Sequence, residues 1–86
     1  MMKLNDTVEM MNSEDYQERF KAEYYQLKER EGKLYAMLEK YKAGTLKFTP
    51  KCSYELLYEQ FVYMRAYRWM LEHRAKVEGI RLKTEE

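Results

Sequence analysis

The chain has 86 residues, of which 45% are hydrophobic and 36% charged, with three glycines and one proline. This mixture is too apolar for a disordered chain and too charged for a membrane span, so it predicts one soluble, helix-rich domain over residues 1–86. The net charge of +1 excludes a strong long-range attraction to DNA, RNA or anionic lipid, so neither nucleic acid nor a membrane is an expected partner.

Residues 1–11 allow two interpretations, a short extra helix or a frayed end. A long first helix is predicted over about residues 13–43, with Asn12 or Ser13 as its cap. Gly44 is the expected left-handed stop. Apolar residues recur at spacings of three and four, with Glu31 in the one gap, and form a single stripe: Tyr16, Phe20, Tyr24, Leu27, Leu34, Leu38 and Tyr41.

A connector over residues 44–51 follows, because Pro50 forbids a continuous helix. From Lys40 to Lys51 the chain carries four lysines and no acid, which fits an anion site involving Lys47 and Lys51. Lysines that complement a helix end and then a solvated loop explain the pattern somewhat better. A second helix is predicted over about residues 52–79, capped by Cys52 or Ser53, with Ile80 and Leu82 packing as a short tail.

Two long helices joined by a short connector predict an all-α antiparallel hairpin. In a symmetric hairpin, Leu38 faces Leu57 and Leu34 faces Phe61. Glu31 then comes close to Arg68 or Arg65, so we expect an ion pair inside the seam. A pair that fixes the register of the helices is favoured over a pair that binds a ligand.

The second helix has more large apolar residues than one partner helix can cover. At about 100° per residue, one stripe facing the first helix holds Leu57, Phe61, Met64, Leu71 and Ala75, with Arg68 among them. Two further apolar arcs flank it, one with Leu56, Tyr63, Tyr67 and Met70, the other with Tyr58, Val62 and Trp69. A helix that is apolar nearly all round is normally buried, so we expect a homo-oligomer formed through this helix.

The same side arcs could also bind a nucleotide, since rings beside arginines can stack a base and hold phosphates. Protein interfaces enrich the same residue types, so an interface is favoured for any single ring. The candidate ligand residues are Arg68, Arg65, Arg74, Tyr67, Tyr63, Tyr58, Trp69, Lys47 and Lys51.

Enzymatic chemistry finds no support in the sequence. The chain has one cysteine and one histidine, and Cys52 and His73 lie about 31 Å apart if they share one helix. They cannot form a dyad or a usual zinc site within one chain. No signal peptide or transmembrane segment is evident. We therefore expect a cytoplasmic protein without catalytic residues, metal or other cofactor.

From about Tyr16 to Leu82 the chain resembles short proteins of crAss-like phages and of phages and prophages of gut and lactic-acid bacteria. The resemblance rests on Gly44, Leu46, Phe48, Thr49, Pro50 and Cys52 in the connector, and then on Leu57, Gln60, Met64, Tyr67, Leu71, Arg74, Ala75, Glu78–Ile80 and Leu82. Ser53 and Arg68 depart from it, at positions where proline and an apolar residue are expected.

The architecture is similar to phage sponge proteins of the anti-CBASS and anti-Thoeris type, which bind cyclic nucleotides or ADP-ribose-derived immune signals without cleaving them. The resemblance therefore implies a counter-defence protein of the host bacterial cytoplasm that sequesters a small anionic signalling nucleotide. An oligomer that docks on a host protein, such as a nuclease or polymerase, is the alternative. A DNA-packaging accessory protein is a third reading, which the near-neutral charge disfavours.

Overall fold

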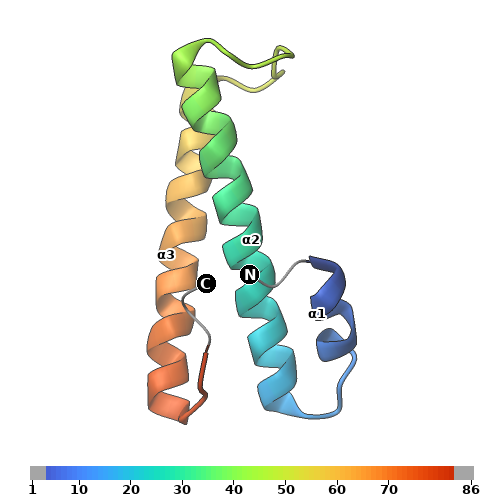
Figure 1. Ribbon diagram of the computed structural model, residues 1–86. Helices are drawn as coiled ribbons and strands as arrows, with labels where there is room; N and C mark the ends of the chain where they lie inside the picture. The colour runs from blue at the N-terminus through green and yellow to red at the C-terminus, as the bar shows by residue number, and fades with distance from the viewer. Residues whose placement is uncertain (1–3, 83–86) are drawn as a thin grey trace.

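A computed structural model describes residues 4–82, and every regular element in this range is a helix. The helices are α1 (Leu4–Met11), α2 (Tyr16–Ala43) and α3 (Tyr54–Glu78). α2 and α3 lie antiparallel, and α1 packs against the half of α2 that is far from the connector (Figure 1). The molecule is elongated, measuring 43 × 24 × 22 Å. The two predicted long helices are confirmed, and the N-terminal segment adds a third.

Local sequence signals determine most helix ends. Gly44 and Gly79 end α2 and α3 in the left-handed conformation, with φ of 76° and 74°, which side chains other than glycine rarely adopt. Ser53 caps α3 by accepting a hydrogen bond from the amide of Leu56 at 3.1 Å. Ser53, one of the two predicted caps, therefore fills the role, whereas Cys52 is an exposed free thiol.

The start of α2 differs from the prediction. Ser13 accepts a hydrogen bond from the Asp15 amide, and Asp15 in turn accepts one from the amide of Gln17. Residues 12–15 therefore form a turn between α1 and α2, and Asp15 rather than Ser13 is the cap. A helix beginning near residue 13 would leave no room for this turn.

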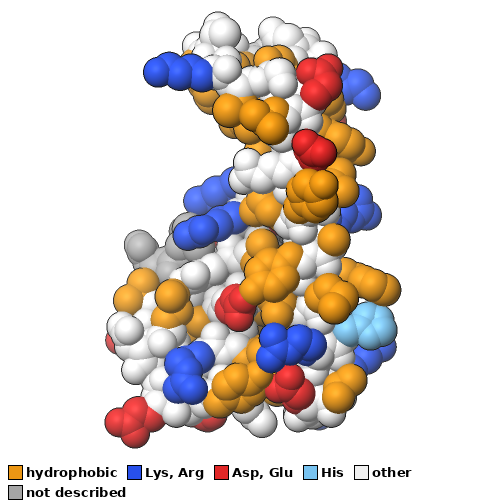
Figure 2. Space-filling model, turned by 180° about the vertical axis from the view of Figure 1, so that it is seen from behind, with side chains coloured by type: hydrophobic (Ala, Val, Ile, Leu, Met, Phe, Trp, Pro, Cys, Tyr) orange, Lys and Arg blue, Asp and Glu red, His pale blue; other side chains and the backbone are white. Residues whose placement is uncertain are grey.

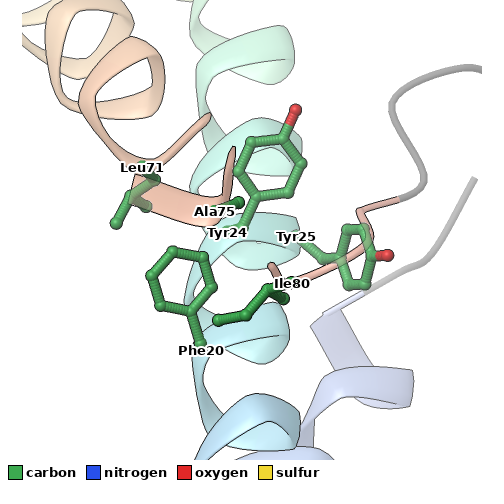
Figure 3. Packing of buried hydrophobic residues seen from close by; sticks show 6 residues of the cluster. All are labelled: Phe20, Tyr24, Tyr25, Leu71, Ala75 and Ile80. Atoms are coloured by element: carbon green, nitrogen blue, oxygen red, sulfur yellow. The ribbon is translucent and has the colours of Figure 1, made fainter. Parts of the chain in front are cut away.

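The main hydrophobic core lies in the half of the hairpin that carries α1. Its buried members come from α2, α3 and the tail after Gly79 (Figure 3): Phe20, Tyr24, Tyr25, Leu71, Ala75 and Ile80. Tyr24 and Leu71 are completely buried. The predicted packing of Ile80 and Leu82 is confirmed, since both contact this cluster. We call residues 4–30 and 70–82 the packed half.

The other half, residues 31–69, has a much thinner core, and we call it the open half. Leu38 and Phe61 are its buried hydrophobic residues, and no second helix covers α2 there. Ring contacts tie the two helices together near the connector, with Tyr41 and Tyr54 at 5.6 Å between ring centroids and Tyr35 and Phe61 at 5.5 Å. Phe48 of the connector is 59% exposed and does not close the end of the hairpin.

Candidate ligand site

Two shallow hollows meet around Arg65 in the open half. The inner hollow, about 440 Å³, lies between α2 and α3 and includes Gly32, Tyr35 and Phe61 in its lining. The outer hollow, about 460 Å³, lies on α3 and includes Tyr58 and Trp69. Phe61, Arg65 and Arg68 line both hollows. Volumes of this size are typical of small-ligand sites.

Two groups of aromatic rings lie beside these hollows. Tyr54 and Tyr58 stack at 6.0 Å with 14° between their planes, and Tyr58 contacts Phe61 at 6.2 Å. Trp69 contacts His73 edge-on at 4.6 Å, yet the indole remains 59% exposed. Phe61 is buried, whereas Tyr58 and Trp69 are thus each held by a neighbouring ring while about half of each side chain stays accessible. Such rings suit stacking against a planar ligand.

Arg68 is held tightly by two carboxylates. Its Nε donates to Glu31 Oε1, its Nη2 donates to Glu31 Oε2 at 3.2 Å, and its Nη1 donates to Glu72 Oε2 at 2.9 Å. The hydrogen bond to Glu31 raises the pKa of Arg68 against the opposing effect of burial. The predicted Glu31–Arg68 pair is therefore confirmed, and its bidentate geometry fixes the position of the guanidinium.

Tyr24 extends this network into the core. Its hydroxyl donates to Glu72 Oε2 at 2.7 Å, so Glu72 accepts from both Tyr24 and Arg68. Burial, followed by the hydrogen bond to Glu72, raises the pKa of Tyr24. This contact could not be predicted, because Tyr24 and Glu72 lie 48 positions apart and each fits an ordinary helix pattern. The network joins the packed half to the lining of the hollows.

Arg65 differs from Arg68 in having no ion pair with any residue in 4–82. It is exposed and lines both hollows. An unpaired guanidinium presents all its donors to a ligand and is well suited to phosphate. Of the arginines predicted from the sequence, Arg65 is thus the one that lines both hollows and has no ion pair within residues 4–82.

The remaining predicted ligand residues lie elsewhere. Arg74 donates to Glu78 and, through Nη2, to Tyr16 at 2.7 Å, and its guanidinium lies 5.0 Å from the ring centre of Phe20. Arg74 therefore links α3 to α2 at the end of the hairpin that lies in the packed half. Lys47 and Lys51 belong to the connector, about 16 Å or more from Arg65, because the helix rises about 1.5 Å for each of the 11 residues from Tyr54.

Tyr63 and Tyr67 also lie outside the hollows. They are 66% and 45% exposed and contribute to the lining of neither. The structure thus separates the two predicted arcs, since Tyr58 and Trp69 border the hollows and Tyr63 and Tyr67 do not. Sequence reasoning missed Tyr35 and Gly32, which line the inner hollow from α2. The available signal was Gly32, a glycine in the interior of a charged helix. An added Cβ at Gly32 would meet no atom within 4 Å, so close packing does not account for the glycine.

Within residues 4–82, no three metal-binding side chains lie close enough together to hold an ion. In the same range, no helix combines the length and the apolar character that crossing a bilayer requires.

Comparison with known proteins identifies a family but gives no individual relative. No curated protein and no solved structure matches the chain. The model of one family, Sequestin, matches residues 14–77, which include all of α2 and nearly all of α3. Its name indicates a sequestering role, that is, binding of a partner rather than conversion of a substrate. The matched residues make up most of the molecule, and the chain therefore belongs to the Sequestin family.

Proposed function

We propose that this protein is a phage counter-defence protein that binds and sequesters a small anionic immune-signalling nucleotide without cleaving it. The ligand would be a cyclic oligonucleotide or an ADP-ribose derivative, bound in the cytoplasm of the host bacterium by a homo-oligomer formed through α3. Membership of the Sequestin family supports the sequestering role. The observation that carries the ligand class is Arg65, an arginine between two ring-lined hollows that has no ion pair within residues 4–82.

The residues around Arg65 divide into three roles. Tyr58 and Trp69 would stack on a base, since each has an exposed ring surface beside the outer hollow. Arg65 would donate to a phosphate. Arg68, held in position by Glu31 and Glu72, would form a rigid part of the surface that the ligand contacts. None of these roles requires a proton transfer or a nucleophile, which accords with binding alone.

Isothermal titration calorimetry with cyclic dinucleotides, cyclic trinucleotides and cyclic ADP-ribose isomers tests this function. We expect one class to bind, and we expect Arg65→Ala to weaken it about 10- to 100-fold, because a charge-assisted hydrogen bond contributes about 1.5–3 kcal/mol. Arg30→Ala is the matched control, since Arg30 is exposed on α2 and lines neither hollow.

Two results would overturn the proposal. One is the absence of any heat of binding with the whole panel, together with no nucleotide released when the purified protein is heated. The other is chemical conversion of a nucleotide in the same mixtures, which would show that the protein is an enzyme. Recovery of a stoichiometric host protein by pull-down, with no small ligand bound, would instead favour a protein-binding inhibitor.

A further inference from the structure

A stripe of apolar side chains runs along the whole of α3, apart from the hollows. Leu56, Tyr63, Met70 and Val77 follow one another at intervals of seven residues, and each is more than half exposed. Hydrophobic side chains are visible along the α3 side of the molecule in Figure 2. Seven residues make nearly two helical turns, so the four side chains lie in one line, as in the seam of a coiled coil.

The positions between these four residues complete a surface that we call the α3 seam. Each interval is filled by two residues on the same face: Glu59 and Gln60, Ala66 and Tyr67, His73 and Arg74. The seam therefore has an apolar residue at each end, an acid near its start, a base near its end, and a small residue beside a large one at its middle. This order is complementary to itself when it is read in the opposite direction.

We propose that a second copy of this chain packs on the α3 seam in an antiparallel arrangement, with the two-fold axis between Ala66 and Tyr67. Leu56 then lies opposite Val77 of the partner subunit, and Tyr63 lies opposite Met70 of the partner subunit. At the axis, the small Ala66 receives the ring of the partner's Tyr67. A two-fold contact uses the same patch on both copies, so each of these pairs occurs twice.

Charge decides between antiparallel and parallel packing. In the antiparallel arrangement, Glu59 lies opposite the partner's Arg74. Glu59 is exposed and has no ion pair within residues 4–82, while Arg74 uses its Nε and Nη2 within its own chain and keeps Nη1 available. A parallel arrangement would bring Glu59 beside Glu59 of the partner subunit and Arg74 beside the partner's Arg74, and like charges in contact disfavour that form.

This dimer would leave most of the ligand site open, although Ala66 lies both in the seam and at the edge of the outer hollow. Trp69 and Arg65 lie about 100° or more around α3 from the middle of the seam, at about 100° per residue. The inference rests on the self-association in the proposed function and assigns it a face and a direction. It also divides the aromatic residues of α3 into two groups, with Tyr63 and Tyr67 at the contact between copies and Tyr58 and Trp69 at the hollows.

Cysteine cross-linking tests the direction of packing in a Cys52→Ser background, which removes the native thiol. Leu56→Cys and Val77→Cys are made as separate single variants. We expect an equimolar mixture of the two to form a disulfide-linked dimer under mild oxidation. Each variant alone should not, because positions 56 and 56 of the partner would lie about 31 Å apart at 1.5 Å per residue.

The matched control is a mixture of two cysteine variants that lie off the seam. Glu55 would not serve, because it shares the face of His73, so the pair used is Tyr58→Cys with Lys76→Cys. These two exposed positions lie on one face of α3, about 130° around the helix from the middle of the seam at about 100° per residue, so we expect no cross-link. Cross-linking of either single variant alone as well as the mixture would show parallel packing and overturn the proposal. So would an absence of cross-links in every sample, or equal cross-linking in the control.

Sedimentation of Met70→Lys and Val77→Lys provides a second measurement. Both residues are exposed, so we expect the helix content of each variant to match the wild type by circular dichroism. The dissociation constant of the dimer should rise about 100-fold, because each dimer gains two charges in an apolar seam. Unchanged self-association would contradict the proposal. Calorimetry with the nucleotide panel reports ligand binding separately, so the two proposals can fail independently.

Discussion

The packed half and the open half of the hairpin use the same kinds of side chain with opposite results. Phe20, Tyr24 and Tyr25 are buried in the packed half, whereas Tyr58 and Trp69 are largely exposed in the open half. The rings do not differ in hydrophobicity. In the packed half, α1, α3 and the tail after Gly79 all pack on α2 or its core, while in the open half α2 has α3 alone. The number of covering segments therefore determines which rings form the core.

Two nearby residues of α3 give the strongest test of this comparison. Leu71→Ala should lower the free energy of unfolding by about 3 kcal/mol, since Leu71 is fully buried. Trp69→Ala should lower it by less than about 1 kcal/mol, although it removes a larger side chain, and should abolish ligand stacking. Urea denaturation at a protein concentration that favours the monomer measures both. If Trp69→Ala lowered the free energy of unfolding as much as Leu71→Ala does, the proposed contrast between the packed half and the open half would be contradicted.

The boundary between the halves is tested at Glu31. Glu31→Gln should lower the free energy of unfolding by about 1–2 kcal/mol, because Arg68 then keeps one carboxylate partner of two in a partly buried setting. Lys33→Gln is the control, since Lys33 is 69% exposed in its 3.7 Å pair with Glu29 and should change stability by less than about 0.5 kcal/mol. Equal effects in urea denaturation would show that the buried pair contributes no more than a surface pair.

The smallest expected effect concerns Tyr24 and pH. Its pKa is raised in the folded state, so its stabilising contribution is complete below the ordinary tyrosine value of 10.0 and is lost as pH rises above it. Between pH 8 and pH 11, the wild type should lose about 1 kcal/mol more stability than Tyr24→Phe does. Denaturation of both proteins at the two pH values gives the difference. A loss of the same size in Tyr24→Phe would assign the effect to other groups.

Much of the fold could be predicted because its signals are local. The end of α2 at Gly44 and the end of α3 near Gly79 follow from single residues, and the Glu31–Arg68 pair follows from two charges in otherwise apolar stripes. The packing of α1 could not be predicted, since eight residues are too few to show a helical period. The burial of Tyr25 and Ala22 could not be predicted either, because both residues lie off the single predicted stripe of α2.

The candidate site was predicted as a set of residues rather than as an arrangement. The sequence identified Arg65, Arg68 and Arg74 as candidates because all three lie among the rings of one helix, and it favoured Arg68 for its place inside the apolar stripe. Their different surroundings depend on residues distant in the chain, such as Glu31 for Arg68 and Tyr16 for Arg74. No periodicity in α3 alone contains that information. Only the paired helices show that Arg65 has no such partner among the residues that the structure describes.

The Glu31–Arg68–Glu72–Tyr24 network has a consequence for how this chain can evolve. The network joins α2 to α3 near the middle of their length. The packed half is therefore held together up to the point where the open half, with its hollows, begins. Substitutions at Tyr58, Val62 or Trp69 alter exposed surface and leave the main core intact. A chain built in this way can change the lining of the hollows through a few mutations while the main core keeps the protein folded.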